Sequence, residues 1–127
     1  MKKSDLRSRR PTVFVIDDDE AVRESQKALL KSAGFAVRVF GSGEEGLREI
    51  PGYPPDCILL DIFLPGMTGF EVLDRIAEET SIPVILMTGK PGAATPTGAR
   101  ARGAATVLEK PLEADCLIGA IDAAIRR

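Results

Sequence analysis

Residues 57–73 read CILLDIFLPGMTGFEVL, and this stretch decides the fold. It begins with a short apolar run that ends in Asp61, as a buried strand does. Thr68 and Glu71 then form a capping-box pattern. The helix that they open has an expected apolar face of Phe70, Leu73, Ile76 and Ala77. A strand followed closely by a helix is the unit from which parallel sheets are built.

The same alternation extends outward in both directions. Four further apolar runs indicate strands: TVFVI (12–16), FAVRVF (35–40), IPVILM (82–87) and ATVL (105–108). We expect FAVRVF to be an edge strand, because it carries Arg38, and the other runs to be buried. The chain is therefore predicted to be α/β, with five parallel strands between two layers of helices.

Four stretches besides the one after Asp61 predict helices. They lie at about 20–34, 42–50, 96–102 and 113–126, and the third is short because Pro and Gly surround it. Two of these helices have a clear expected core face, made of Val22, Leu29, Leu30 and Ala33 in the first and of Leu117, Ile121, Ala124 and Ile125 in the last.

Length and composition limit the function. The 127 residues suffice for one domain, and we expect residues 1–10 to be a mobile basic leader and 11–127 to be that domain. The absence of His excludes His-based metal sites and His general bases. A net charge of −2 and few aromatic residues give no indication of direct nucleic-acid binding. No apolar run is long enough to span a membrane. Cys57 and Cys116 are expected to be buried free thiols.

Polar residues follow most of the predicted strands. Asp17, Asp18 and Asp19 follow the first, Asp61 the third, Thr88 the fourth and Lys110 the fifth. Ligands of open parallel sheets bind at the carboxyl ends of the strands. In a flavodoxin-like sheet of order 2-1-3-4-5 the first and third strands are neighbours, so Asp17, Asp18 and Asp61 would crowd together. Such a carboxylate cluster needs a cation, and it favours Mg²⁺, with Mn²⁺ as the alternative.

These pieces together resemble the receiver domains of two-component response regulators. The resemblance covers residues 11–125 and rests on VFVIDDDEAVRES, CILLDIFLPGMTGFEVL, PVILMTG and VLEKP, in this order and spacing. In these motifs the sequence is most similar to the nitrogen-fixation-type regulators, whose receivers precede a LuxR-like helix-turn-helix domain. The resemblance implies the (βα)5 receiver fold with sheet order 2-1-3-4-5.

The resemblance also implies a role for each matching residue. Asp61 resembles the phosphoacceptor, Asp18 the direct metal ligand, and Asp17 its partner in metal binding. Three further positions match as well: Phe63, whose backbone carbonyl would bind the metal; Thr88, whose hydroxyl would turn toward the phosphoryl group; and Lys110, which would pair with the phosphate and precede a cis peptide bond to Pro111. Gly69 falls where the loop after the acceptor turns tightly.

The function implied is that of a regulatory switch in the cytoplasm. A partner histidine kinase or phosphotransfer protein would donate the phosphoryl group to Asp61, and the switched domain would control an output, expected to be transcriptional. Beyond its own phosphorylation and slow dephosphorylation the domain would not be an enzyme. A homodimer is compatible with the family. The chain stops where a linker to a DNA-binding domain would start, so we expect it to be a fragment of a longer regulator.

Two positions depart from the family pattern. Val107 stands where most relatives have Tyr or Phe, whose ring reorients on activation, and valine has no such ring. The segment 91–102 is richer in Pro and Gly than the usual fourth helix.

Two other functions compete with the switch. The spacing of Asp17 and Asp19 matches the D-x-D motif of haloacid-dehalogenase-type phosphatases, although Asp61 would then have no role as acceptor. The fold would also suit a docking module that works without phosphorylation, and Val107 is the feature that favours this alternative.

Overall fold

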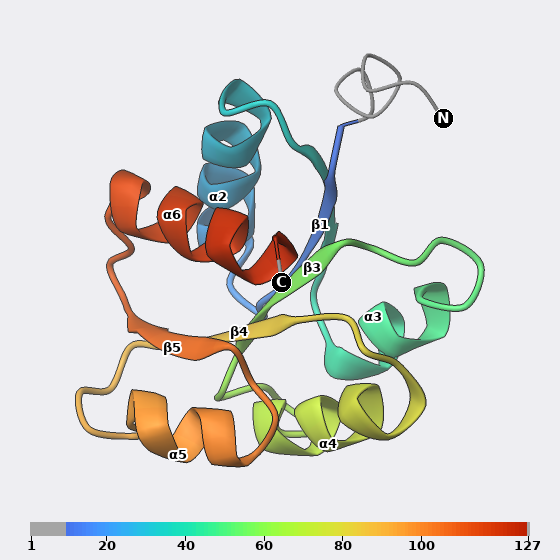
Figure 1. Ribbon diagram of the computed structural model, residues 1–127, viewed down its shortest axis with the longest axis vertical. Coiled ribbons are helices and arrows are strands. Elements are labelled where there is room, and N and C mark those ends of the chain that lie inside the picture. Colours follow the sequence, from blue (N-terminus) through green and yellow to red (C-terminus); the bar gives the residue numbers. More distant parts are fainter. Residues whose placement is uncertain (1–9, 127) are drawn as a thin grey trace.

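The protein folds as a single parallel sheet between two layers of helices (Figure 1). The computed structural model describes residues 10–126, so the basic leader expected at 1–10 lies outside the described residues except for Arg10. The strands are β1 (Thr12–Ile16), β2 (Ala36–Phe40), β3 (Cys57–Asp61), β4 (Val84–Thr88) and β5 (Thr106–Glu109). Their order is β2-β1-β3-β4-β5, which confirms the flavodoxin-like arrangement predicted from the sequence.

The three central strands are buried along their whole length. Every residue of β1, β3 and β4 is buried, since helices cover both of their faces. Both edge strands are more open: in β2 only Phe40 is buried, and in β5 only Val107. The edge position of β2 is confirmed. The prediction that the run at 105–108 is a buried strand was wrong, because it forms the second edge of the sheet.

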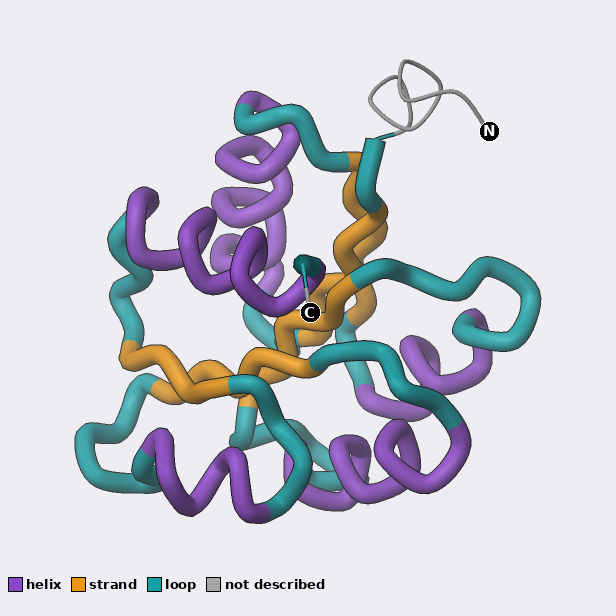
Figure 2. Tube along the Cα trace, in the orientation of Figure 1, coloured by secondary structure: helices purple, strands orange, loops and turns teal. Residues whose placement is uncertain are grey.

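The helices divide between the two faces of the sheet. They are α2 (Glu20–Ser32), α3 (Gly43–Glu49), α4 (Gly69–Glu79), α5 (Pro96–Ala101) and α6 (Ala114–Ile125). Figures 1 and 2 show α2 and α6 side by side on one face, and α3, α4 and α5 on the other. The helix between Pro96 and Ala101 is short, as its Pro and Gly content predicted.

Alternate residues of each central strand supply the two layers of the core. In β1, Phe14 and Ile16 face α3 and α4, where they join Leu60, Val72 and Ile76 among others. Val13 and Val15 face the opposite side, where the core includes Leu30 of α2 and Leu117 and Ile121 of α6. This period of two is the geometry of a strand that is covered on both sides.

Three residues that we expected to be buried are exposed. Ala33 lies at the C-cap of α2, where the chain already leaves the helix, and Ala77 lies on the outer side of α4. Cys116, in the first turn of α6, is exposed as well, whereas Cys57 is buried as predicted. Among residues 10–126 no helix combines the length and apolarity needed to cross a membrane.

Candidate functional site

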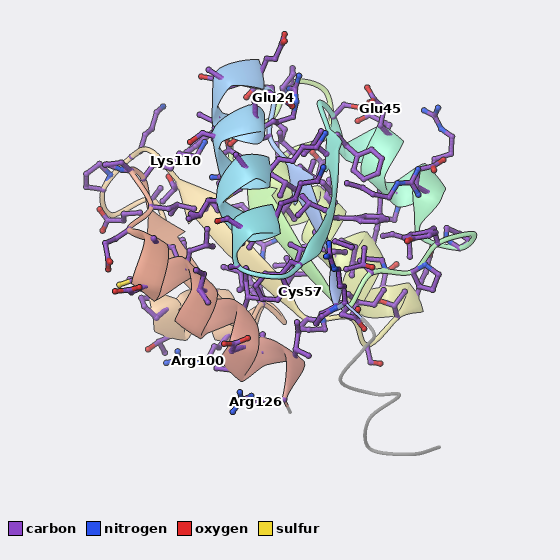
Figure 3. The ribbon with its side chains drawn as sticks, turned by 90° about the horizontal axis from the view of Figure 1, so that it is seen from above. Glu24, Glu45, Cys57, Arg100, Lys110 and Arg126 are labelled. Atoms are coloured by element: carbon purple, nitrogen blue, oxygen red, sulfur yellow. The ribbon has the colours of Figure 1, made fainter. Side chains whose placement is uncertain are left out.

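Four of the predicted site residues meet at the carboxyl ends of the strands. Asp17 and Asp18 follow β1, Asp61 ends β3, and Lys110 follows β5. One carboxylate oxygen from each of Asp17, Asp18 and Asp61 lies within 4.8 Å of the others. The topology causes this meeting, because β1 and β3 are neighbours and run in the same direction. Figure 3 shows Lys110 and Cys57 toward opposite ends of the sheet, with Lys110 at the end where the site lies.

Asp61 is a buried carboxylate held on both oxygens. Its Oδ1 accepts a hydrogen bond from the Phe63 N–H (3.0 Å) and its Oδ2 accepts one from the Lys110 Nζ (2.9 Å). Burial raises the pKa of Asp61, and the neighbouring charge of Asp17 acts in the same direction. The hydrogen bonds from Lys110 and Phe63 oppose this rise without cancelling it. The surroundings therefore penalise the charge of Asp61, and an added cation or a neutralised carboxylate would relieve that penalty.

Asp17 is fully buried and is held on four sides. The Lys110 Nζ donates to its Oδ2 at 2.6 Å and the Asp19 N–H to its Oδ1 at 3.0 Å. Its own N–H donates to the Phe40 carbonyl at 3.1 Å, which continues the pairing of β1 with β2. Its carbonyl oxygen accepts a hydrogen bond from the Arg23 Nη1 at 2.8 Å. Asp17 is thus the most constrained acid of the cluster.

Lys110 bridges the two buried carboxylates. Burial by itself would lower its pKa, but the hydrogen bonds to Asp17 and Asp61, together with the negative charges of these two acids, raise the pKa of Lys110 above its ordinary value. The Lys110 N–H donates to the Thr88 carbonyl at 2.7 Å, so the lysine is anchored to the end of β4. The Lys110–Pro111 peptide bond is cis, as predicted.

The donors in this cluster suit a hard cation. They are carboxylate oxygens, with no nitrogen or sulfur ligand among them, and the cluster already contains two acids that are at least nine-tenths buried. Asp18 is the exposed member, and one of its carboxylate oxygens lies within 4.8 Å of those of Asp17 and Asp61. The acidic cluster therefore fits a hard divalent cation such as Mg²⁺. The backbone carbonyl of Phe63, two residues after Asp61, stays a predicted ligand.

Asp19 plays a structural part. Its Oδ1 accepts hydrogen bonds from the N–H groups of Ala21 (2.9 Å) and Val22 (3.2 Å), so Asp19 is the N-cap of α2. Asp19 is the second acid of the D-x-D spacing, and its side chain is engaged in capping this helix. The phosphatase alternative therefore loses the acid that it needs near the reacting phosphorus.

Thr88 lies at the predicted place, but its hydroxyl bonds to the loop that follows. The Thr88 Oγ1 accepts from the Lys90 N–H (3.0 Å) and donates to the Lys90 carbonyl (3.3 Å). The Lys90 Nζ in turn lies 4.6 Å from the centre of the Phe63 ring, a cation–π contact between two exposed side chains. Thr88 is therefore connected to the Asp61 loop through Lys90 and Phe63.

Gly69 is required by a close approach rather than by an unusual dihedral angle. A Cβ at this position would clash with the Asp61 carbonyl oxygen and would lie 2.6 Å from the Ile62 Cα. The Gly69 N–H donates to the Ile62 carbonyl at 2.9 Å, which closes the loop after the acceptor. The tight loop predicted here is confirmed, and Gly66, with φ of 75°, makes the turn itself.

Sequence reasoning missed several contacts around the site. It assigned no role to Arg23 and did not find the pairing of Lys90 with Phe63. It also missed a cavity of about 530 Å³ next to the site, between α2 and the loop before α6; this cavity is lined by Ala21, Val22, Ser25, Gln26, Leu29, Gly89, Lys110, Pro111, Leu112 and Leu117. Helix periodicity indicates which face is buried, but it does not show how far a long side chain reaches along the helix.

Val107, the main departure from the family pattern, is buried. It is 8% exposed and packs with Ala99 and Ala104 in the core layer under α5. The position thus contributes apolar packing and offers no ring that could move between a buried and an exposed orientation.

Comparisons with known proteins agree with this geometry. The family model for the response regulator receiver domain matches residues 13–122. The transcriptional regulatory protein FixJ of Bradyrhizobium diazoefficiens is 40% identical over 116 residues, which cover 91% of this chain and 57% of FixJ. The transcriptional regulatory protein AfsQ1 of Streptomyces coelicolor is 35% identical over 117 residues, which cover 92% of this chain and 52% of AfsQ1. The chain therefore spans about half the length of these curated relatives.

Solved structures show the same fold. The crystal structure of a response regulator receiver domain protein from Clostridium thermocellum has a TM-score of 0.86 and 32% sequence identity; the match covers 92% of this chain and 95% of that one. The sheet order, the acidic cluster at its carboxyl edge and the family match over residues 13–122 lead to one conclusion. The chain belongs to the response regulator receiver domain family of two-component signalling.

Proposed function

We propose that Asp61 is the phosphoacceptor of this receiver domain, which we take to comprise residues 11–127. The observation that carries the proposal is the surroundings of Asp61: a buried carboxylate 2.9 Å from the Lys110 ammonium, with Asp17 and Asp18 within 4.8 Å. A carboxylate nucleophile, a cation and metal-binding acids at one point are the parts needed to form an acyl phosphate.

The donor would be a phosphohistidine of a histidine kinase or phosphotransfer protein, since this chain contains no His. A carboxylate oxygen of Asp61 attacks the phosphorus and forms a P–O bond. The P–N bond breaks, and its electron pair stays on the imidazole of the donor, which then takes up a proton. Lys110, 2.9 Å from the acceptor, pairs with a phosphoryl oxygen as the phosphoryl group arrives.

Mg²⁺, or Mn²⁺ in its place, would be held by Asp17, Asp18 and Asp61 with the Phe63 carbonyl. When bound, the ion would offset the negative charge of the transferring phosphoryl oxygens. Asp17 contributes a carboxylate that Lys110 and the Asp19 N–H already orient, so little rearrangement is needed at this residue.

The phosphorylated domain would also promote its own slow dephosphorylation. Water attacks the acyl phosphate at phosphorus and returns Asp61 as a carboxylate, with phosphate as the product. Beyond these two reactions at its own aspartate the domain needs no enzymatic activity. Its role is regulatory, as expected for a family that works in signalling.

The output would be transcriptional. The curated relatives FixJ and AfsQ1 are transcriptional regulatory proteins, and they are about twice as long as the part that this chain matches. A separate segment of the whole protein would then contact DNA, and this domain would not bind nucleic acid itself. We place the protein in the cytoplasm, where the donor phosphohistidine is available, and consider a homodimer compatible with this role.

Intact mass spectrometry tests the proposal. The protein is incubated with acetyl phosphate or phosphoramidate in the presence and absence of Mg²⁺. We expect the mass of one phosphoryl group to be added to the wild type with Mg²⁺ and not to Asp61→Asn. Asp56→Asn is a matched control, because Asp56 precedes β3 at the opposite end of the same strand, where its Oδ2 accepts from the Thr12 N–H at 2.7 Å.

Three results would count against the proposal. An adduct that persists in Asp61→Asn would place the phosphoryl group on another residue. A loss in both aspartate variants would show that the substitution acts through folding. No adduct in any variant, together with no binding of beryllium fluoride, would favour the docking module that works without phosphorylation.

A further inference from the structure

Arg23 makes a contact that none of the roles above uses. It is the fourth residue of α2, and its Nη1 donates to the Asp17 carbonyl oxygen at 2.8 Å. Side chains of a helix lean toward its N-terminus, so Arg23 reaches back across the loop that joins β1 to α2. This loop contains Asp17 and Asp18, two of the three acids of the cluster.

The place of this arginine is electrostatically unfavourable for the helix itself. A cation in the first turn opposes the helix dipole. Among residues 10–126, the ion pairs within 4.0 Å involve Arg38, Arg102 and Lys110 but not Arg23. The guanidinium therefore binds a backbone carbonyl instead of a carboxylate, and this contact is its main interaction with the loop.

The carbonyl that Arg23 binds belongs to the peptide group between Asp17 and Asp18. A peptide group is planar, so fixing its oxygen also fixes the direction in which the chain enters Asp18. The backbone before this peptide is held by the hydrogen bond from the Asp17 N–H to the Phe40 carbonyl. The backbone after it is held by the hydrogen bond from the Asp19 N–H to the Asp17 Oδ1. Arg23 thus adds a third hydrogen bond to the backbone on either side of Asp18.

Because Gly41 has no side chain, the Arg23 guanidinium can lie beside it. A Cβ built on Gly41 would lie 3.3 Å from the Arg23 Nη1, which is tighter than usual, and 3.7 Å from its Cζ, an ordinary contact. Gly41 directly follows β2, so the end of a neighbouring strand also determines the position of the arginine. This is an observation independent of the hydrogen bond.

We propose that Arg23 is a positioning residue for the cation site: by holding the Asp17–Asp18 peptide it orients the Asp18 carboxylate for metal binding. The inference rests on the proposed metal site at Asp17, Asp18 and Asp61. It gives Arg23 no contact with the phosphoryl group and no part in the transfer itself.

The sign of the effect distinguishes positioning from simple electrostatics. Removing a positive charge near a cation site strengthens cation binding if only the Coulomb interaction matters. Loss of a residue that orients a ligand weakens binding, typically by roughly 10- to 100-fold for such supporting contacts. Arg23→Gln therefore gives opposite results under the two explanations.

Isothermal titration calorimetry of Mg²⁺ into the full chain tests the proposal, together with the thermal midpoint of each metal-free variant. We expect Arg23→Gln to raise the Kd for Mg²⁺ roughly tenfold, and Arg23→Lys to restore part of the affinity. Gly41→Ala keeps the charge but moves the guanidinium by a few tenths of an ångström, so a smaller rise in the Kd is expected. Arg75→Gln makes the same change in charge at an exposed residue of α4 and leaves the Kd unchanged.

An unchanged or lower Kd in folded Arg23→Gln would overturn the proposal, whatever happens to its thermal midpoint. If Arg23→Gln does not fold, a Kd for Arg23→Lys equal to that of the wild type decides against it instead. Phosphorylation of the same variants by phosphoramidate at saturating Mg²⁺ is expected to reach the wild-type extent. Failure of the proposed function would appear separately, as a wild type that forms no adduct at Asp61.

Discussion

The ammonium of Lys110 lies closer to Asp17, at 2.6 Å, than to Asp61, at 2.9 Å. One lysine thus serves two carboxylates, of which Asp17 is fully buried and Asp61 almost so. The side chain of Lys110 is itself only 20% exposed. The cluster holds more negative charge than this single cation balances, and that excess explains both the need for a metal and the stability effects expected below.

Replacing Lys110 should destabilise the metal-free protein. Lys110→Gln leaves Asp17 and Asp61 without their shared cation, and unpairing buried charges costs about 3–5 kcal/mol, less here because Lys110 is partly exposed. We expect a loss of about 2–3 kcal/mol in urea unfolding without Mg²⁺. Mg²⁺ should restore part of this loss, because it supplies the missing positive charge. Equal unfolding free energies for the two proteins would contradict this account of the cluster.

Neutralising the acceptor should have the opposite effect. Burial and the charge of Asp17 raise the pKa of Asp61, so the ionised form of this carboxylate lowers the free energy of unfolding at neutral pH. Asp61→Asn should raise the metal-free unfolding free energy, because it removes the penalised charge while Lys110 stays paired with Asp17. The same variant should lose most of the stabilisation that Mg²⁺ gives the wild type. Urea unfolding with and without Mg²⁺ measures both effects, and a less stable variant would refute the first.

The sheet order and the meeting of Asp17, Asp61 and Lys110 could be predicted because they follow from strand ends. A parallel sheet brings the carboxyl ends of its strands to one edge whatever the loops do. The direction of the Thr88 hydroxyl could not be predicted, since it depends on the backbone of Lys90 in the next loop. The hydrogen bond of Arg23 and the contact of Lys90 with the Phe63 ring were missed because hydrogen bonds to a backbone carbonyl and contacts with a ring leave no pattern in the sequence.

Burial was predicted less well at the ends of helices than in their middle. Leu30, Leu73, Ile76, Leu117 and Ile121 were expected in the core and lie there. Ala33 is the C-cap of α2 and Cys116 lies in the first turn of α6, and at such helix ends periodicity no longer indicates what covers a side chain. Ala is also small enough to lie on either face without penalty, which explains the error at Ala77.

Gly69→Ala should disturb both the fold and the acceptor. The added Cβ has no room against the Asp61 carbonyl oxygen, so either α4 or the end of β3 must move. Overpacking of this kind costs about 1–3 kcal/mol. Because the clash is with the acceptor's own backbone, phosphorylation by phosphoramidate should slow as well. Gly119→Ala in α6 is the control, since a Cβ there meets nothing within 4 Å. It should leave the phosphorylation rate unchanged and raise the unfolding free energy by about 0.5–1 kcal/mol, the usual gain from Gly to Ala inside a helix.

The contact between Phe63 and Lys90 should prolong the life of the acyl phosphate. It joins the loop after Asp61 to the loop after Thr88, with Nζ 4.6 Å from the ring centre. An exposed cation–π contact contributes about 0.5–1 kcal/mol, so Lys90→Gln or Phe63→Leu should hasten dephosphorylation roughly two- to fivefold by admitting water. If the two residues act as a pair, the double variant should be no faster than either single one. Arg102→Gln removes a similar contact with Phe70, at 4.3 Å, and should not change the rate.

The two cysteines should differ sharply in their reaction with alkylating reagents. Burial raises the pKa of Cys57 to about 12, so this thiol should react only after unfolding. Cys116 is exposed and should react in the folded protein, although its hydrogen bond to Glu113 raises its pKa. Only the thiolate reacts, so the rate at Cys116 should rise roughly tenfold per pH unit below that pKa.

Glu113→Gln lowers the pKa of Cys116 and should speed its alkylation at pH 8, provided that α6 keeps its cap. Mass spectrometry of alkylated peptides measures both sites at once. Alkylation of Cys57 at the rate of Cys116 under native conditions would show that the layer between β3 and α6 opens far more often than its packing allows.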